Sequence, residues 1–488
     1  MDYAISSESM KLSDENTIIN NGVSAITLMD RASHAIFNEI IKDDYQNIAV
    51  VCGSGNNGGD GYSLSLKLLD SGKSVTVYGK EPKTESSKYY FDILIKRYKI
   101  AYKPICEMQE LDKFDLVVDC LLGIGITGEL SEEYIAYIKL INKGKYIISC
   151  DIPSGLNSDN GKKSPIAVKA DKTIAIQSYK TGHFLGDGKD YVGKIKVCDI
   201  GITIVGKKFY ICDSDFVRSS FPEKSNNSHK GNFGRCGIVA CSENFVGAGL
   251  LSVTALASTI GECAMRVGSG YSYLFVPDKM LPAMWGRVTH ACVFSHSDLL
   301  KHNLDSIAFG MGIGKNKKLF DNVADYPCVK VLDADGLNML SQDMAKIDKF
   351  KGCVLTPHVM EFSRLTKHSV SDILQNPIQL AEQFAQKYQV VLLLKGATSV
   401  ITDGEETYLN IAGNSGMAKG GSGDVLSGII AGLLAQKFAP LKSAVLAAYI
   451  AGKTADNVKN MSSEYSMLPM DCALDVGYTL SKILKREL

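Results

Sequence analysis

Several features that mark particular classes of protein are absent from the sequence. No two of the 13 cysteines are spaced Cys-x-x-Cys, and their number is odd, which argues against a zinc ribbon and against a secreted disulfide framework. The eight histidines are scattered, so no metal site of cysteine and histidine is indicated. Lys plus Arg and Asp plus Glu are equal at 53 each, so the charge balance favours neither nucleic acid nor an acidic membrane as a partner.

Long apolar runs are also missing. No apolar stretch reaches the roughly 20 residues that a membrane span needs, and the first ten residues, MDYAISSESM, lack the basic stretch and apolar run of a signal peptide. Cysteines such as Cys52, Cys120 and Cys353 lie within apolar, strand-like runs, as free thiols do in a reducing compartment. We therefore expect a cytoplasmic protein that has no membrane partner and no nucleic-acid partner.

At 488 residues the chain is too long for a single hydrophobic core. From Ile48 to about Asp199, short apolar runs rich in β-branched residues alternate with stretches of helical spacing, which predicts an open α/β sandwich with crossover helices. The predicted strands are Ile48–Cys52, Ser74–Gly79, Phe114–Leu122, Lys145–Ile152 and Lys172–Gln177, and the predicted helices are Tyr62–Leu69, Glu132–Ile141 and one or two within Thr17–Ile40.

A polar stretch, Glu223–Asn232, interrupts this alternation and is the best linker candidate, because it is rich in Asn, Ser and Lys and has no periodicity. The alternation then restarts. Further strands are predicted within 236–241, 306–314, 329–338, 352–357, 390–396 and 398–403, and further helices at Gly249–Glu262, Met360–Leu365, Pro377–Gln389 and Val425–Leu434. We predict two α/β domains, residues 1–212 and 228–488, joined by residues 213–227.

The segment Gly413–Gly428, GNSGMAKGGSGDVLSG, holds six glycines and one acid, Asp424, and runs into an apolar helix. Such a loop lets backbone N–H groups close on a phosphate, and the helix N-terminus adds its partial positive charge. No Lys-Ser/Thr pair closes the loop, so it is not a Walker P-loop. Asp424 is placed to take the proton from a hydroxyl that is phosphorylated there. The alternative is a glycine-rich surface turn in which Asp424 only caps the helix.

A second glycine-rich stretch, Cys52–Tyr62, follows a predicted strand and opens a helix. It matches the dinucleotide pattern Gly-x-Gly-x-x-Gly, but the acid expected at the end of the next strand is missing. Asn56, Asn57 and Asp60 place amides and a carboxylate where that pattern needs close backbone approach. These polar groups indicate recognition of a ligand beyond a pyrophosphate.

Two further strand ends carry polar residues and would meet this stretch at one edge of a parallel sheet. Asp119 ends one strand, and Asp151 and Ser154 follow the next. Asn57, Asp119 and Ser154 could converge as oxygen ligands, which suits an alkali or alkaline-earth cation. Asp151 remains as an acid–base candidate. For each acid alone, the alternative is a helix cap or a turn former.

Together, NNGGDG, VVDCLLGIGITG and DIPSGLN resemble the NAD(P)H-hydrate epimerase domain over roughly residues 1–212. The resemblance implies a Rossmann-like three-layer sandwich that interconverts the R and S forms of hydrated NADH and NADPH. It implies that Asn57, Asp119 and Ser154 bind potassium and that Asp151 binds substrate and assists at the epimerising carbon. The substrate contacts that it implies are Asn56, Asn57, Gly58, Gly59, Asp60, Gly123, Ile124, Gly125, Ile126, Thr127, Gly128 and Glu129.

In the second half, the motifs TPH, KGATS and GNSGMAKGGSGD resemble the ribokinase-like, ADP-dependent NAD(P)H-hydrate dehydratase over about residues 225–488. The resemblance implies that Asp424 is the catalytic base and that Mg²⁺ takes part. It implies hydrated-dinucleotide contacts at Ala248, Gly312, His358 and Asp424, and adenine-nucleotide contacts at Lys395, Gly396, Ala397, Thr398, Ser399 and Gly423. The chain departs from the family pattern at Val359 and Met360, where Pro-Gly is common, and at Ser415, where proline is common.

The two halves make chemical sense together. Hydroxide is a poor leaving group and phosphate is a good one, so a phosphoryl-transfer fold can dehydrate the hydrate by phosphorylating its C6 hydroxyl and eliminating phosphate. The fused epimerase would convert the unusable epimer to the usable one. The alternatives are a small-molecule kinase with a fused nucleotide-binding domain, which has no need of the first half, and a non-catalytic nucleotide-binding regulator, which could lose either catalytic acid. We expect a homo-oligomer whose partners are small molecules.

Overall fold

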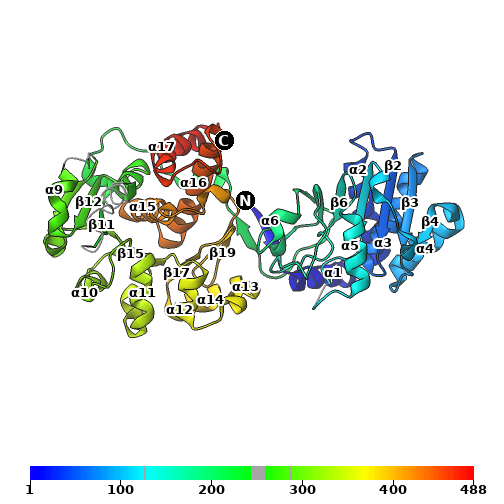
Figure 1. Ribbon diagram of the computed structural model, residues 1–488, viewed down its shortest axis with the longest axis horizontal. Coiled ribbons are helices and arrows are strands. Elements are labelled where there is room, and N and C mark those ends of the chain that lie inside the picture. The colour runs from blue at the N-terminus through cyan, green and yellow to red at the C-terminus, as the bar shows by residue number, and fades with distance from the viewer. Residues whose placement is uncertain (126–127, 243–258, 286–287, 289, 488) are drawn as a thin grey trace. The chain divides into compact units, whose positions relative to one another are not determined.

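The computed structural model describes residues 1–488 apart from 126–127, 243–258, 286–287, 289 and 488. The chain forms two compact units (Figure 1). One comprises Tyr3–Phe209, and the other comprises Met1–Asp2 with Tyr210–Leu488. The segment that the sequence suggested as a linker, residues 213–227, lies within the second unit and contains the helix α7, Ser214–Ser220.

Among the described residues, the first unit contains a seven-stranded sheet in the order β4-β3-β2-β5-β6-β7-β9, and every neighbouring pair is parallel. The strands are β2 (Asn47–Cys52), β3 (Ser74–Gly79), β4 (Tyr102–Pro104), β5 (Leu116–Cys120), β6 (Ile147–Cys150), β7 (Lys172–Ile176) and β9 (Lys194–Cys198). The five predicted strands are therefore confirmed. The edge strands β4 and β9 escaped prediction because they are short or alternate lysine with apolar residues.

Alternate residues of the central strands face two different helical layers. Val50 and Val118 belong to one core with the helices α2, α3 and α4, whereas Val51 and Val117 belong to another with α5. This period of two makes the unit a three-layer sandwich, as predicted. The described α-helices are α1 (Ser7–Asn21), α2 (Ala25–Ile40), α3 (Asn56–Asp70), α4 (Glu85–Tyr98), α5 (Glu132–Ile141) and the short α6 (Gly188–Tyr191). A short strand pair, β1 (Asp2–Ile5) with β8 (Tyr179–Lys180), completes it.

The helix α1 begins ten residues before the predicted stretch. Ser6 caps it by accepting a hydrogen bond from the backbone N–H of Ser9, and Gly22 ends it in the left-handed conformation at φ 66°. Because α1 carries few large apolar residues, its sequence pattern alone did not mark it as a helix.

The second unit contains a mixed sheet whose described strands run β13-β12-β11-β14-β15-β16-β17-β18-β19-β10. The pairing is parallel from β13 to β17, antiparallel through β17, β18 and β19, and parallel again between β19 and β10. The strands are β10 (Phe209–Ile211), β11 (Arg235–Val239), β12 (Tyr271–Val276), β13 (Cys292–Ser295), β14 (Ser306–Phe309), β15 (Val329–Leu332), β16 (Val354–Leu355), β17 (Val391–Leu394), β18 (Ser399–Thr402) and β19 (Thr407–Asn410).

Helices cover both faces of this sheet (Figure 1). The helix α15 is buried along nearly its whole length, between the central strands and α16. The described helices include α10 (Lys317–Asp325), α11 (Ala334–Gln342), α12 (Val359–Thr366), α13 (Val370–Gln375), α14 (Pro377–Tyr388), α15 (Ser422–Ala435), α16 (Pro440–Met461) and α17 (Pro469–Lys485). The predicted helices at α12, α14 and α15 are confirmed, and most of the one predicted at Gly249–Glu262 lies outside the described residues.

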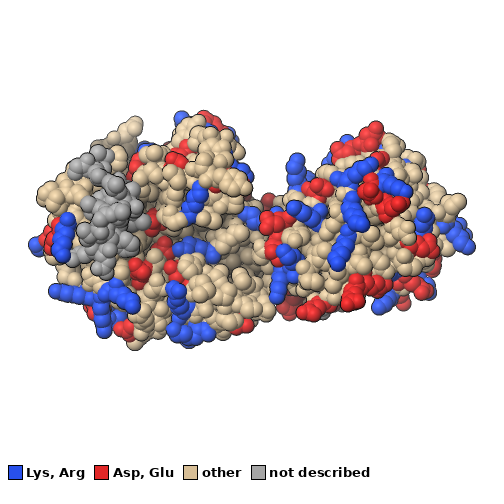
Figure 2. Space-filling view, in the orientation of Figure 1, with Lys and Arg blue, Asp and Glu red and all other residues tan. Residues whose placement is uncertain are grey.

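Several strands are shorter in the structure than the runs in which they were predicted. The run 329–338 forms a strand only over Val329–Leu332, because Asp333 caps the helix α11 and turns the chain. Of the described helices, none combines the length and apolar character needed to cross a membrane. Lys, Arg, Asp and Glu side chains are interspersed on the face shown in Figure 2, in keeping with the even charge balance of the sequence.

Candidate active sites

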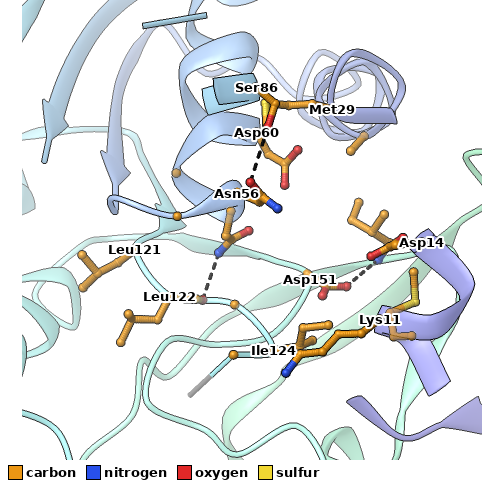
Figure 3. Close-up of a pocket in the computed structure, with 18 of the residues that line it drawn as sticks. Lys11, Asp14, Met29, Asn56, Asp60, Ser86, Leu121, Leu122, Ile124 and Asp151 are labelled. Carbon is orange, nitrogen blue, oxygen red and sulfur yellow. Dashed lines mark hydrogen bonds between the residues drawn. The ribbon is translucent and has the colours of Figure 1, made fainter. Parts of the chain in front are cut away.

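The first unit contains a cavity of about 710 Å³ at the carboxyl ends of its parallel strands (Figure 3). The ends of β2, β5 and β6, the start of α3 and one face of α1 contribute to its walls. A cavity of this size at this edge of an α/β sheet is typical of a small-molecule site.

The NNGGD motif forms the first turn of α3 rather than a free loop, since the helix begins at Asn56. Close backbone packing requires glycine at Gly58 of this motif and at Gly53, which precedes it. A Cβ on Gly58 would lie 1.9 Å from the carbonyl oxygen of Gly53, and one on Gly53 would lie 1.9 Å from that of Leu121. The motif therefore needs glycine so that the start of α3 can reach the end of β5.

Asn57, Asp119 and Ser154 converge, as the sequence suggested. The carboxylate of the fully buried Asp119 accepts hydrogen bonds from the Ser154 N–H at 2.9 Å, from the Ser154 hydroxyl at 2.6 Å and from the Ser149 hydroxyl at 2.8 Å. Burial raises the pKa of Asp119, and these hydrogen bonds oppose the shift.

The backbone of Leu122 joins Asn57 to this group. The Asn57 amide donates to the Leu122 carbonyl at 2.9 Å, and the Leu122 N–H donates to the Ser154 hydroxyl at 2.8 Å. The side-chain oxygen of Asn57 is buried and has no hydrogen-bond partner in the part of the chain that the structure describes. A buried acceptor of this kind, beside a carboxylate and a hydroxyl, fits a hard cation.

Asp151 lies at the end of β6 in the left-handed backbone conformation, at φ 62°. Its carboxylate forms an ion pair with Lys180, whose side chain is fully buried, and accepts a hydrogen bond from the Ile176 N–H at 2.9 Å. A ring nitrogen of His183 lies 2.9 Å from the Asp151 carbonyl oxygen, and burial followed by the charge of Lys180 lowers the pKa of His183 to about 4. The neutral His183 ring and the cation Lys180 thus hold Asp151 toward the cavity.

Two more carboxyl groups face the same cavity (Figure 3). Burial, opposed by Lys180 and reinforced by Asp151, raises the pKa of Asp14 to about 6. The pKa of Asp60 is raised well above its ordinary value by burial and then by Asp151 and Asp14. Sequence reasoning missed Asp14, Lys180 and His183. A lysine three residues after the predicted strand Lys172–Gln177 was the available signal for Lys180.

Most of the predicted substrate contacts line the cavity: Asn56, Asn57, Gly58, Asp60, Gly123, Ile124, Gly125, Glu129 and Asp151. Gly59 instead packs against Met29 and Ser87, and Gly128 is not among the lining residues. Ile126 and Thr127 lie outside the described residues. The structure therefore brings the NNGGD motif, the turn that begins at Gly123 and Asp151 to one cavity.

In the second unit, Asp333, Lys395 and Asp424 gather where β15 and β17 end and α15 begins. Lys395 Nζ lies 2.6 Å from Asp333 Oδ1, and the Ser427 hydroxyl lies 3.3 Å from Asp333 Oδ2. A Cβ on Gly423 would lie 3.0 Å from Asp333 Oδ2 and 3.5 Å from Lys395 Nζ. Gly423 therefore leaves the space between the helix start and this ion pair open.

Asp424 lies in the first turn of α15 and is 9% exposed. Its pKa is raised to about 7, first by burial and then by Asp333, while Lys395 acts in the opposite direction. A carboxyl group with this pKa is matched to proton transfer near neutral pH. In the sequence Asp333 fell only within the run 329–338 in which a strand was predicted, and its pairing with Lys395 is a finding of the structure.

His358 caps α12 rather than standing free. Its Nδ1 accepts hydrogen bonds from the backbone N–H groups of Met360 and Glu361 at 3.1 and 3.4 Å, and the Glu361 carboxylate accepts from the His358 N–H at 2.8 Å. The His358 side chain is half exposed, and its Nε2 lies 3.5 Å from Glu361 Oε1. Val359 and Met360 simply form the first turn of α12, so this departure from the family pattern keeps the cap.

The other predicted residues of the second site are placed as follows. Lys395–Ser399 spans the turn between the antiparallel strands β17 and β18, and includes Gly396, Ala397 and Thr398. Gly312 adopts φ 62° beside open space. Gly421 precedes α15 at φ 105°, and the Ser415 hydroxyl donates to the Glu464 carboxylate. Ala248 lies outside the described residues.

Comparison with known proteins gave matches over both units. Residues 25–182 match the family described as YjeF-related protein N-terminus, and residues 236–475 match the family described as NAD(P)H-hydrate dehydratase. The bifunctional NAD(P)H-hydrate repair enzyme of Coxiella burnetii is 31% identical, over 94% of this chain and 95% of its own. That of Helicobacter pylori is also 31% identical, over 95% and 97%. An ADP/ATP-dependent NAD(P)H-hydrate dehydratase structure from Bacillus subtilis, co-crystallized with ATP/Mg²⁺, is 26% identical with a TM-score of 0.48, over 57% of this chain and 98% of that one.

Proposed function

This chain belongs to the family of bifunctional NAD(P)H-hydrate repair enzymes, and we propose that it returns hydrated NADH and NADPH to their intact forms in two steps. The first unit interconverts the R and S hydrates, and the second dehydrates the S form at the expense of ADP. The observation that carries this proposal is the buried Asp424, whose pKa is raised to about 7 at the start of a helix that follows a glycine-rich loop.

In the dehydration, Asp424 takes the proton of the C6 hydroxyl while the hydroxyl oxygen attacks the terminal phosphorus of ADP. This attack releases AMP. The N–H groups at the start of α15 and the Lys395 ammonium lie where the transferred negative charge gathers. The ring nitrogen then expels phosphate, and loss of the C5 proton restores the reduced nicotinamide.

Mg²⁺, held mainly by the nucleotide's own phosphates, would neutralise charge during the transfer. The residues proposed for the adenine nucleotide are Lys395, Gly396, Ala397, Thr398, Ser399 and Gly423. His358, Gly312 and Ala248 are proposed for the hydrated dinucleotide.

In the epimerisation, Asp151 is the proposed acid–base group, held by Lys180 and His183. The start of α3 and the turn that begins at Gly123 would bind the dinucleotide through backbone N–H groups. Potassium is the proposed cation of Asn57, Asp119 and Ser154, and the unpartnered buried oxygen of Asn57 supports this. When bound, it supplies a fixed positive charge beside the cavity.

Only one epimer can present its hydroxyl in line with the phosphate of ADP, which gives a physical reason for joining an epimerase to a dehydratase in one chain. A vitamin kinase of the same fold would have no use for the cavity of the first unit. The cytoplasmic location and the homo-oligomeric state expected from the sequence remain predictions.

One assay tests the proposal. The purified chain is incubated with ADP, Mg²⁺ and a mixture of R and S hydrated NADH, and near-UV absorbance is followed. Recovery of the whole mixture is expected, whereas recovery of the S fraction alone would remove the epimerase step. No recovery in the presence of ADP or ATP would overturn the dehydratase assignment.

A further inference from the structure

The helix α1 brings a carboxyl group into the cavity of the first unit. Met10, Lys11, Asp14 and Ile18 recur at helical spacing and line that cavity. The helix is tied down beside Asp14, because the Val205 N–H donates to the Ser13 hydroxyl at 3.0 Å. The position of Asp14 is therefore set by the packing of α1.

Asp14 and Asp151 face one buried cation, but only Asp151 is bonded to it. Lys180 forms an ion pair with Asp151 and donates to the Ile176 carbonyl oxygen at 2.7 Å. Within the described residues, the Asp14 carboxyl has no hydrogen bond and no ion pair, although it feels the charges of Lys180, Asp151 and Glu15.

This difference separates the two carboxyl groups chemically. Asp151 accepts from an ammonium and from a backbone N–H, which is the arrangement of a carboxylate. The partly buried Asp14, whose pKa is raised to about 6, is the group of the pair that keeps a proton. Asp60 on α3 and Glu129 are the other carboxyl groups that line the cavity, and Lys11 on α1 is a further charge there.

We propose that Asp14 is a second acid–base residue of this cavity. Asp14 gives a proton to the substrate in one step, and Asp151 takes a proton from it in the next. This rests on the proposed epimerase function. Asp14 gives its proton to the C6 hydroxyl, the C6–O bond breaks, and water leaves a ring cation in which N1 and C6 share a double bond. Water adds to the other face of C6 and gives a proton to Asp151.

Protons and electrons balance in this cycle, because one proton enters with the leaving water and one is released when water returns. In the reverse reaction Asp151 donates and Asp14 accepts. A carboxyl pair that carries a single proton therefore serves both directions. Solvent exchange between turnovers returns the proton to its starting carboxyl group.

A structural role explains Asp14 less well. It caps no helix and forms no ion pair among the described residues, so the desolvation of its partly buried carboxyl group is offset only in part, by the charge of Lys180. Unpartnered ionisable groups that line a cavity are more common at functional sites.

The test compares Asp14→Asn with Glu15→Gln, which makes the same charge change at the next, exposed position of α1. The initial rate of R-to-S conversion is measured from pH 5 to pH 8, and ADP-dependent turnover of the S hydrate in each sample checks that the chain is folded. Asp14→Asn should lower epimerisation by about 10²–10⁴-fold. The wild-type rate should fall as pH rises through about 6, and Asp14→Glu should restore part of that pH dependence.

Unchanged rate and pH profile in Asp14→Asn would overturn the role of Asp14. So would a wild-type pH profile without a decline near 6, a result that needs no variant at all. An equal loss in Glu15→Gln would assign the effect to the charge of α1 and reject the proposal. Failure of the wild-type chain to epimerise would instead refute the proposed function.

Discussion

Replacing Asp424 by asparagine should make the second unit more stable and its dehydration far slower. Asparagine has nearly the same size as aspartate and keeps its place in the first turn of α15, but it cannot accept the proton of the C6 hydroxyl. Loss of a general base costs about 10²–10⁴ in rate. Affinity for the nucleotide should be nearly unchanged, because the N–H groups of α15 and Lys395–Ser399 are untouched.

The stability change follows from the pKa of Asp424, which rises from 3.8 to about 7 on folding. Because the pKa is raised, the folded state binds the proton more tightly, and stability falls as pH rises from about 4 to about 7. The shift is about 3 pH units, and each is worth about 1.4 kcal/mol. Folding at pH 8 is thus penalised by up to about 4 kcal/mol, and asparagine removes that penalty.

Urea unfolding of both proteins at pH 5 and pH 8 measures this effect. The free energy of unfolding of the wild-type chain should decrease from pH 5 to pH 8. That of Asp424→Asn should decrease by a few kcal/mol less over the same pH range. Turnover of the S hydrate with ADP is measured on the same samples. Epimerisation should continue at its normal rate, because its residues lie in the other unit.

Three results would refute this reasoning. Near-normal ADP-dependent turnover would mean that Asp424 is not the base of the reaction. An identical pH dependence of unfolding in the two proteins would mean that Asp424 does not carry the buried charge. Loss of both activities with the fold intact would mean that the two sites do not work independently.

Three further substitutions test other parts of the structure. Asn57→Ala should weaken the potassium dependence of R-to-S conversion and leave dehydration unchanged, because it removes the buried unpartnered oxygen beside Asp119; an unaltered potassium response would exclude the cation site. Lys395→Met should destabilise the chain by about 3–5 kcal/mol, because Asp333 stays buried without its ion pair; an unchanged urea midpoint would contradict this. Gly58→Ala should lower Tm and abolish epimerisation, because its Cβ would lie 1.9 Å from a carbonyl oxygen; a wild-type Tm would show that the start of α3 can shift.

The strands of the first unit could be predicted because local pattern and tertiary environment agree there. Val50 and Val118 are β-branched and lie in strands covered on both faces, so their segments read as buried parallel strands without knowledge of their neighbours. Glycine-rich turns are equally local, because the close approach at Gly58 excludes any side chain. Asp151 and Asp424 were therefore recognisable as candidates from the residues around them.

Tertiary structure decided which groups act on those residues. Lys180 reaches Asp151 from a separate strand, Lys395 reaches Asp333 across the sheet, and Asp14 enters its cavity from a helix with few large apolar residues. Their pKa shifts depend on burial and on charges distant in sequence, which no local pattern encodes. The sequence by itself thus determined the folds and pointed to the candidate acids. Only the packing of the chain decided their charge states, because desolvation and Coulomb interactions act through space.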